Sequence, residues 1–322
     1  MKKYTVGLIG ATGLVGRTIL DILDKENLPI EKLILFASKN SENKKLKYKN
    51  KYLKVNVLDE KSLENLDICL FAVNKDISAQ YVPIALKNGC VVIDNSSFFR
   101  MKKNVPLIVP EINFETITDS KLISNPNCAT IQSVMVLNAL KKYGIKKINY
   151  VSLQSVSGAG KKALMDLKNK TQEFFPHPIN QNIIPLIGNK DKENYSAEEV
   201  KMIEETKKIL NLKKVCISST CLRIPIEISH SVVIKVKLMK KVTCARIKKD
   251  LACIQGIKVL DDLDNNIYPL NLMAKGNDLV YVGRIRKDLS EKNSFLLYCV
   301  SDNLRKGAAL NVVQILKRII LK

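Results

Sequence analysis

A short apolar strand, a run of evenly spaced glycines and a helix constrain the fold of this chain more than any other feature. Tyr4–Ile9 has the composition of a buried strand, Gly10-Ala11-Thr12-Gly13-Leu14-Val15-Gly16 follows, and Thr18–Leu23 carries a helical apolar pattern. The first glycine allows a tight turn, the second lets a pyrophosphate approach the backbone, and the third lets the helix pack closely. We predict a dinucleotide-binding turn here, with a plain glycine turn as the alternative.

The segment after the second expected strand indicates which dinucleotide is bound. Leu33–Phe36 is apolar and is followed by Ala37, Ser38 and Lys39 without an acidic residue. An NAD site places Asp or Glu near this point to bond the ribose hydroxyls, whereas hydroxyls and a lysine suit a 2′-phosphate. The pattern favours NADP; a solvated polar loop is the alternative.

Further apolar runs recur at the spacing of strand–helix–strand units. They lie at Asp67–Ala72, Val91–Asp94 and Leu107–Val109. Alternation of such runs with helical segments predicts a parallel sheet with crossover helices.

Cys128 lies where an extended segment, Lys121–Ser124, gives way to a helical pattern. Apolar residues from Thr130 onward recur at helical spacing up to Gly144, which predicts an amphipathic helix with a glycine after its end. The unpaired N–H groups and the dipole of a helix N-terminus favour a thiolate and can hold an oxyanion. A reactive thiol is therefore one interpretation, and a buried structural cysteine is the other.

Composition limits the class of protein. A chain of 322 residues that is 46% hydrophobic has enough apolar surface for one large or two medium domains. The eight cysteines show no CxxC or metal-ligand spacing, and neither a signal peptide nor an apolar run of transmembrane length appears. These features predict a reduced, cytoplasmic protein that binds no metal and no membrane.

The net charge of +22 leaves three interpretations open. Lysines gather at Lys44–Lys51 but are otherwise spread along the whole chain, and no nucleic-acid-binding motif accompanies them. A coding bias toward lysine is favoured over help in collecting anionic ligands, and both over nucleic-acid binding. We expect no nucleic-acid partner.

Three polar residues make Cys128 more than a core thiol. Gln154 lies in a glycine-punctuated turn, Ser152–Gly160, after an expected strand at Ile148–Val151. Alternation over Arg223–Ile234 predicts one strand that carries both Arg223 and His230, although Pro225 leaves open whether they share a face. His177 lies in a proline-rich loop, so His230 is the candidate acid/base, with a pKa near working pH. Ordinary structural roles for His230 and Arg223 are the alternatives.

Taken together, these motifs resemble the aspartate-β-semialdehyde dehydrogenase family along essentially the whole chain. The resemblance rests on the following segments: Gly10–Gly16, Asp94–Arg100, Val109–Asn113, Pro126–Thr130, Gln154–Gly160, Glu198–Lys201, Arg223–Pro225, His230, Val282–Arg286 and Ser301–Ala309. It implies an α/β fold with an N-terminal Rossmann-type dinucleotide-binding domain and an α+β catalytic and dimerisation domain. We expect the first at 1–127, with the C-terminal helix 306–322 returning to it, and the second at 128–305.

The resemblance also implies a reaction and its residues. The family reduces L-aspartyl-4-phosphate to L-aspartate-4-semialdehyde with NADPH in lysine, threonine and methionine biosynthesis, and releases phosphate. Cys128 would form a thioacyl intermediate, His230 would act as general acid/base, and Gln154 would orient the acyl group. The implied substrate contacts are Arg223 to the α-carboxylate, Glu198 to the α-amino group, Arg100 and Lys201 to the phosphate, and Asn127 to the oxyanion. The implied cofactor residues are Gly10, Thr12, Gly13, Leu14, Val15, Ser38, Lys39, Ser157, Gly158 and Asn303.

One position departs from the family pattern, and three alternative functions remain open. Many relatives carry an arginine on the 2′-phosphate where this chain has Asn40, and Glu42 adds a negative charge, so Lys39 or Lys44 would have to substitute. The enzyme rival is N-acetyl-γ-glutamyl-phosphate reductase; the others are a non-catalytic paralogue and a basic nucleic-acid binder. We expect a homodimer, with a homotetramer as the open alternative.

Overall fold

The computed structural model describes residues 2–321 and divides the chain into two compact units. One unit comprises Met1–Pro126 and Ala308–Lys322, and the other comprises Asn127–Gly307. Among residues 2–321, no helix is both long and apolar enough to cross a membrane.

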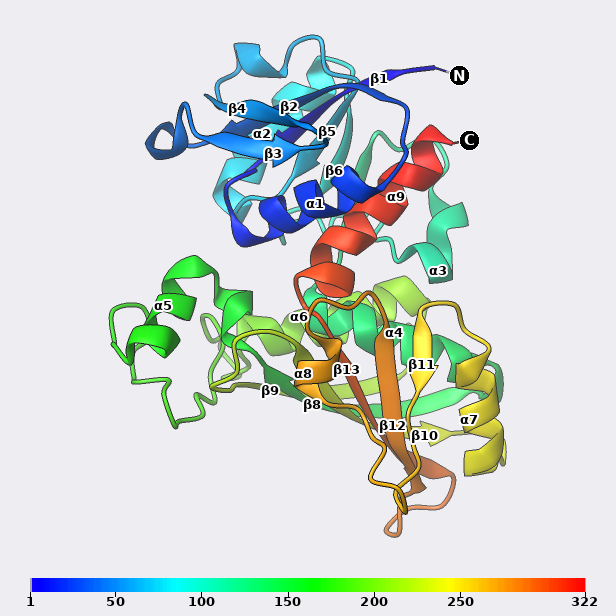
Figure 1. Ribbon diagram of the computed structural model, residues 1–322. Helices are drawn as coiled ribbons and strands as arrows, with labels where there is room; N and C mark the ends of the chain where they lie inside the picture. The colour runs from blue at the N-terminus through cyan, green and yellow to red at the C-terminus, as the bar shows by residue number, and fades with distance from the viewer. Residues whose placement is uncertain (1, 322) are drawn as a thin grey trace. The chain divides into compact units, whose positions relative to one another are not determined.

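The first unit is built on a seven-stranded sheet with the order β3-β4-β2-β1-β5-β6-β7 (Figure 1). All neighbouring strands pair in parallel except β3 and β4, which form an antiparallel hairpin. The strands are β1 Tyr4–Ile9, β2 Ile30–Ala37, β3 Lys45–Tyr48, β4 Lys51–Val57, β5 Ile68–Phe71, β6 Val91–Asp94 and β7 Leu122–Ser124. The helices are α1 Leu14–Lys25, α2 Lys75–Lys87, α3 Pro110–Asn113 and α9 Leu310–Ile320.

The predicted parallel sheet is confirmed, with two corrections. The strands expected at Tyr4–Ile9 and Val91–Asp94 are found with those bounds. Leu107–Val109 is not a strand: it contributes only a bridge from Leu107 to Ser124, and the sheet instead ends in β7. The lysine-rich stretch forms the β3–β4 hairpin, which the sequence did not predict because its charges mask the alternation of an edge strand.

The C-terminal helix α9 packs in the first unit. Figure 1 shows α9, in red, beside α1, and the two helices are in contact. Val312, Val313, Ile315 and Leu316 are buried in the same cluster as strand residues such as Leu8. This burial accounts for the apolar stripe of the terminal segment, which no isolated helix would keep in water.

The second unit is built on a six-stranded mixed sheet with the order β11-β12-β13-β10-β8-β9. The strands are β8 Ile145–Gln154, β9 Cys216–Arg223, β10 His230–Leu238, β11 Ile257–Val259, β12 Val280–Lys287 and β13 Ser294–Ser301. The helices are α4 Cys128–Leu140, α5 Lys161–Asn169, α6 Ala197–Leu210, α7 Cys244–Ala252 and α8 Asn271–Ala274. Helices α4 and α6 pack against each other, α4 also contacts β8, β10 and β13, and α6 also contacts β9.

Helix α4 differs from the amphipathic helix that was expected. Eleven of its residues are buried, so the helix is enclosed on all sides by the sheet and by α6 and α7. The spacing of its apolar residues resembled one stripe because small or neutral residues such as Ala129 and Ser133 occupy the other faces. The helix ends at Leu140, and Gly144 then takes a positive φ of 72°, which a glycine adopts without strain.

Candidate active site

Cys128 is the first residue of α4, as the sequence predicted. Asn127 precedes it as the N-cap, and its Oδ1 accepts hydrogen bonds from the N–H groups of Ala129 (2.9 Å) and Thr130 (3.2 Å). Cys128 itself is half-buried. A Cβ on Gly307 would lie 3.0 Å from the Cβ of Cys128, so only glycine fits beside the thiol without displacement. The helix N-terminus favours the thiolate form of such a cysteine.

Two carboxylates of α6 hold Asn127 in place. Glu198 Oε1 accepts from the Asn127 amide Nδ2 at 2.5 Å, and Glu205 Oε2 accepts from the Asn127 backbone N–H at 2.7 Å. Glu198 and Glu205 lie two turns apart and therefore share one face of the helix. Glu205 is not among the residues predicted from the sequence; its helical spacing from Glu198 was the available signal. The Asn127 side chain is thus engaged as a helix cap and as a donor to Glu198.

Gln154, Arg223 and His230 meet at one edge of the second sheet. Gln154 ends β8 and pairs in parallel register with Arg223, which ends β9. His230 begins β10, whose next residue, Ser231, pairs with Leu153. The single strand expected over Arg223–Ile234 is therefore wrong: residues 224–229 form a loop that divides it in two. The division brings Arg223 and His230 to neighbouring strand ends, which counting along one strand could not show.

His230 is buried and neutral. Burial and the positive charge of Arg223 together lower its pKa to about 3, although the carboxylate of Glu198 acts in the opposite direction. The expected pKa near working pH is therefore wrong, because an imidazolium would lose its hydration and would face a cation. Nδ1 lies 3.0 Å from the backbone N of Ser155, whose N–H donates to it.

Two buried nitrogens at this sheet edge have no hydrogen-bond partner among the residues that the structure describes. They are Nε2 of His230 and Nε2 of Gln154. Most buried polar groups are paired, and a buried donor left unpaired costs about 1–3 kcal/mol. Gly158 lies against this region, since a Cβ there would be 3.1 Å from His230 Nε2 and 3.0 Å from Arg223 Nη1. The arrangement leaves the Gln154 amide N–H and the His230 Nε2 available to a ligand.

The buried side chains of Arg223 and Glu198 form a charged group with the half-buried Lys201 near these nitrogens. Arg223 donates from Nη1 to the Ser155 carbonyl at 2.7 Å, and the negative charge of Glu198 acts on its guanidinium. Lys201 Nζ lies 2.9 Å from Glu198 Oε2. Burial raises the pKa of Glu198, but Lys201, the Asn127 amide and Arg223 together lower it to about 2. Glu198 is therefore a carboxylate, and cationic and anionic groups are both available to a zwitterionic substrate.

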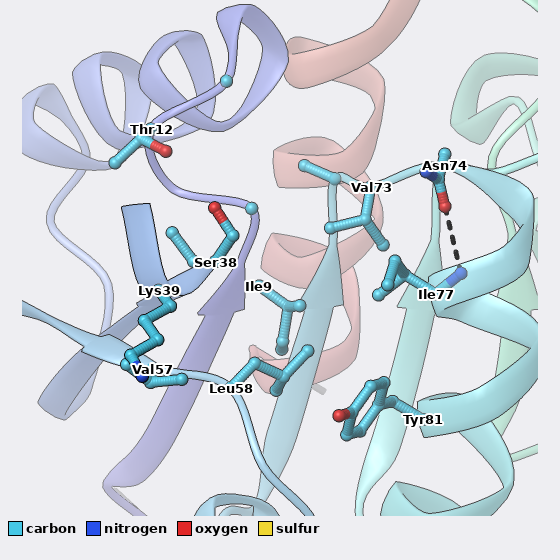
Figure 2. Close-up of a pocket in the computed structure, with 14 residues that line it drawn as sticks. Ile9, Thr12, Ser38, Lys39, Val57, Leu58, Val73, Asn74, Ile77 and Tyr81 are labelled. Carbon is cyan, nitrogen blue, oxygen red and sulfur yellow. Dashed lines mark hydrogen bonds between the residues drawn. The ribbon is translucent and has the colours of Figure 1, made fainter. Parts of the chain in front are cut away.

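The first unit contains a pocket of about 340 Å³ at the glycine turn. Gly10, Thr12 and Gly13 line it together with Ser38 and Lys39, which follow β2. Figure 2 shows Thr12, Ser38 and Lys39 on one side of the pocket and Val73, Asn74, Ile77 and Tyr81 on the other. No acidic side chain lines the pocket among the described residues. The pocket therefore has a polar side and an apolar side, as a nucleotide requires.

The glycines of the turn are required by close contacts. Gly10 has a φ of 88°, and a Cβ there would lie 2.4 Å from the Ala72 carbonyl oxygen. A Cβ on Gly16 would lie 2.1 Å from the Gly10 carbonyl oxygen, so the third glycine lets α1 pack against the turn. Gly13 is the N-cap of α1, and Leu14 and Val15 form its first turn. The first N–H groups of α1 therefore face a phosphate position with no capping side chain in the way.

The remaining predicted residues lie in both units. Arg100, in the first unit, is buried and donates from Nη2 to the Asn95 carbonyl at 2.8 Å. Ser157 and Asn303, expected at the cofactor, lie in the second unit, where the Asn303 amide is bonded to Ser155, Ser157 and Ser229. Both side chains are therefore also part of a buried hydrogen-bond network that includes Ser155 and Ser229, the residue before His230.

The fold and these two sites define a semialdehyde dehydrogenase with a dinucleotide-binding unit and a thiol-bearing unit. The family model described as "Semialdehyde dehydrogenase, NAD binding domain" matches residues 5–120, and "Semialdehyde dehydrogenase, dimerisation domain" matches residues 137–306. The chain belongs to the aspartate-semialdehyde dehydrogenase family. Its cofactor is a nicotinamide dinucleotide.

Individual relatives agree with this assignment. The aspartate-semialdehyde dehydrogenase of Aquifex aeolicus is 43% identical over 97% of this chain and 96% of its own length. That of Bacillus subtilis is 39% identical over 96% of this chain and 95% of its own length. The crystal structure of aspartate semialdehyde dehydrogenase II from Vibrio cholerae, complexed with ASA, is 35% identical and matches with a TM-score of 0.96 over 100% of this chain and 99% of that one.

Proposed function

We propose that this chain catalyses the NADP-dependent reductive dephosphorylation of L-aspartyl-4-phosphate to L-aspartate-4-semialdehyde in lysine, threonine and methionine biosynthesis. One observation carries the proposal: a half-buried cysteine begins α4, in a unit whose sheet edge holds two unpaired buried nitrogens and a buried arginine. A thiol, oxygen-directed donors and a carboxylate-binding cation are the groups that acyl transfer from an amino-acid acyl phosphate needs. N-acetyl-γ-glutamyl-phosphate reductase is not favoured, because the similar proteins are aspartate-semialdehyde dehydrogenases.

The nucleophile of the proposed reaction is the Cys128 thiolate. Its Sγ bonds to the acyl carbon while the bond from that carbon to the phosphate oxygen breaks, and phosphate leaves with the electron pair. A bound dinucleotide supplies the hydride that reduces the resulting thioester. Breaking the C–S bond then releases the aldehyde and restores the thiolate. Gln154 orients the acyl group, and His230 acts at the acyl oxygen.

Charged side chains hold the two ends of the substrate in this proposal. Arg223 binds the α-carboxylate with its guanidinium fork, and Glu198 binds the α-amino group. Glu198 is suited to this role because it is ionised. Arg100 and Lys201 bind the phosphate. Support of the oxyanion by Asn127 remains a prediction, since the Asn127 amide is already engaged with Glu198 and the α4 backbone.

The activity is tested by phosphate-dependent reduction of NADP⁺ with aspartate semialdehyde, beside N-acetylglutamate semialdehyde as the rival substrate. Cys128→Ala should abolish turnover and leave dinucleotide binding intact, because the glycine turn lies in the other unit. Activity of Cys128→Ala within about tenfold of the wild type would exclude the covalent mechanism, since loss of a nucleophile costs far more. Preference for the longer substrate would exclude the proposed one.

NADP is the proposed form of the cofactor. Ser38 and Lys39 line the pocket where a 2′-phosphate would be held, and Asn40 stands in place of the usual arginine. Lys44 Nζ donates to the Ser41 hydroxyl at 3.4 Å, and the Thr12 hydroxyl donates to the same oxygen at 3.3 Å. These contacts bring a second cation beside the pocket. A lysine–phosphate contact on an exposed loop contributes about 1–2 kcal/mol, or roughly ten- to thirtyfold in affinity.

Kinetics with both nucleotides test this preference. The ratio of kcat/KM for NADPH over NADH should be about ten to thirty and should fall as salt rises, because exposed charges are screened. Lys39→Ala and Lys44→Ala should each lower the ratio through NADPH alone. Equal use of NADH by the wild type would show that Asn40 and Glu42 have changed the specificity.

The proposed assembly is a homodimer through the open face of the second sheet. Helices α4 and α6 lie against one face, whereas Val151 on the other face is 40% exposed and its neighbours Leu222, Val233 and Tyr298 are only half-buried. The family model for this region is a dimerisation domain, so a second copy is the proposed occupant. Val151→Asp should shift the mass in solution toward the monomer, while Leu289→Asp, on an exposed hairpin, should not. A monomeric wild type would refute the proposal.

A cytoplasmic location is also part of the proposal. The eight cysteines are all free, and several are buried in the two cores. Free thiols of this kind persist in reducing compartments. Fractionation of the native cells, with detection of the chain in the soluble cytoplasmic fraction, tests this point.

A further inference from the structure

Exposed lysines without ion-pair partners gather on residues 39–54 of the first unit, which include the β3–β4 hairpin. They are Lys39, Lys44, Lys45, Lys47, Lys49, Lys51 and Lys54. None of them forms an ion pair in the part of the chain that the structure describes, whereas lysines elsewhere, such as Lys235 and Lys317, do. The segment contains one acidic residue, Glu42. Clustered charges of one sign that no partner offsets create a long-range electrostatic field.

The hairpin carries its lysines on the face that points away from the core. Lys45 lies opposite Lys54, whereas the next pair, Leu46 and Leu53, packs on the core side. Like charges directly opposite each other destabilise a strand pair. Lysines on an edge strand prevent pairing with other chains, which accounts for Lys45 on β3. It does not account for Lys54, because β4 is paired on both sides, with β3 and with β2.

One end of the hairpin adjoins the nucleotide pocket. Strand β4 ends at Val57, which pairs with the last residue of β2 and lines the pocket together with Lys39 (Figure 2). Lys54 precedes Val57 by three residues, which is about 10 Å along a strand, and Lys51 precedes it by six, which is about 20 Å. Lys45 lies level with Lys54 because the two residues are paired. The hairpin therefore has a pocket end and a turn end that differ in their distance from a bound nucleotide.

The charge of the dinucleotide and the salt concentration determine how far each lysine acts. NADPH carries about four negative charges, about two of them on the 2′-phosphate, which NADH lacks. At 0.15 M salt the Debye length is about 8 Å. The screened attraction then favours the approach of NADPH about twofold for a lysine about 10 Å away, but only about 1.1-fold for a lysine about 20 Å away. At the turn end, the carboxylate of Asp24 also accepts a hydrogen bond from the backbone N–H of Lys49, so the positive field is weaker there.

We propose that the β3–β4 hairpin is an electrostatic steering surface for the phosphates of the dinucleotide, and that Lys45 and Lys54 raise its association rate without contacting it once it is bound. The inference rests on the proposed cofactor and extends it. Lys39 and Lys44 act on the bound 2′-phosphate, whereas the hairpin lysines act during the approach. Because steering depends on the charge of the ligand, it acts more strongly on NADPH than on NADH.

Stopped-flow fluorescence of NADPH tests the proposal with the full chain and without substrate, because it measures association and dissociation separately. Lys45→Gln combined with Lys54→Gln should lower the association rate constant about fivefold at 0.15 M salt and leave the dissociation rate constant within about twofold. The loss should be larger at 0.01 M salt, where the Debye length is about 30 Å. Lys49→Gln combined with Lys51→Gln is the matched control, since it removes the same charge from the same hairpin. It should lower the association rate constant less than about 1.5-fold at 0.15 M salt.

Three comparisons decide the outcome. Equal losses of the association rate constant in the two double variants would show that only the net charge matters, and would overturn the proposal. Faster dissociation with unchanged association in the Lys45 and Lys54 variant would indicate direct contact and would overturn it as well. The fold loss for NADH should be about the square root of that for NADPH, or roughly twofold, because the charge of the ligand is halved. An equal fold loss for both nucleotides would contradict steering.

A charge-conserving variant and the wild type complete the test. Lys45→Arg combined with Lys54→Arg keeps both charges and should retain the association rate constant of the wild type, and a loss like that of the glutamine variant would refute a purely electrostatic role. A wild type that bound neither nucleotide would refute the proposed cofactor and this inference with it. Binding of NADPH without a difference between the two double variants would refute this inference alone.

Discussion

Replacing Asn127 by alanine should destabilise the second unit and misplace Cys128, although the thiol itself is untouched. The Asn127 side chain makes two sets of contacts at once. Its Oδ1 caps the N–H groups of Ala129 and Thr130, and its Nδ2 donates to Glu198. Asn127 is only 6% exposed, so water cannot readily replace either set.

The expected loss follows from these contacts. Replacing an N-cap asparagine by alanine costs about 1 kcal/mol, and removing a hydrogen bond to a charged group costs about 1.5–3 kcal/mol. The free energy of unfolding of the second unit should therefore fall by about 2–4 kcal/mol. For a domain of this size the melting temperature should fall by about 4–16 °C. The pKa of Glu198 should rise, because the Asn127 amide is one of the groups that lower it.

Asn127→Ser provides the matched control. Serine keeps an oxygen that can cap α4 but loses the amide donor to Glu198, so it should be more stable than Asn127→Ala by about 1 kcal/mol. Urea unfolding monitored by circular dichroism measures both differences, and the rate of Cys128 alkylation measures the position of the thiol. A loss of unfolding free energy below about 0.5 kcal/mol in Asn127→Ala would refute the assignment of Asn127 as the N-cap of α4 and as a donor to Glu198. Equal losses in the two variants would refute it as well.

Three further predictions address the neighbouring residues. Gly158→Ala should lower kcat about ten- to hundredfold with little loss of stability, because its Cβ would crowd Arg223 Nη1 and the imidazole of His230. Gly160 has a φ of 95° and a Cβ there would meet nothing within 4 Å, so Gly160→Ala should cost about 1–3 kcal/mol of stability and leave kcat nearly unchanged. A stability loss in Gly158→Ala with a kcat loss in Gly160→Ala would contradict both expectations. Arg223→Lys should lower kcat/KM about 30- to 150-fold, or 2–3 kcal/mol, mainly through KM, and an unchanged kcat/KM would remove Arg223 from the substrate site. Burial raises the pKa of Asp166, but hydrogen bonds from the N–H groups of residues 173–175 and from a threonine hydroxyl lower it to about 2. The difference in unfolding free energy between the wild type and Asp166→Asn should therefore be constant above about pH 5 and should become smaller as the pH falls from about 4 toward 2. A difference that grows in acid would contradict the lowered pKa.

The local features that the sequence predicted correctly depend on short-range geometry. The strand Tyr4–Ile9 and the glycine turn were readable because Gly10 needs a positive φ and Gly16 needs close packing, and both requirements act on neighbouring residues. Cys128 at a helix N-terminus could be predicted because the extended segment ends at Ser124 and helical apolar spacing begins near Thr130. Neither the exposed hairpin β3–β4 nor the burial of helix α4 on all sides could be predicted, because periodicity alone does not show which elements pack over a strand or a helix.

By itself, the sequence predicted the parallel first sheet, the candidate thiol and the set of polar residues around it, because the periodicity of apolar residues and short motifs can be recognised without knowing which elements pack together. Only the tertiary structure decided how those residues meet. It divided Arg223 and His230 between two strands, placed Gln154 beside both, and brought Glu205 of α6 to the backbone of Asn127. It also lowered the pKa of His230 to about 3, because burial and the charge of Arg223 come from strands that pair only in the folded sheet. Protonation is a property of the surroundings, and the chain supplies these surroundings only when it is folded.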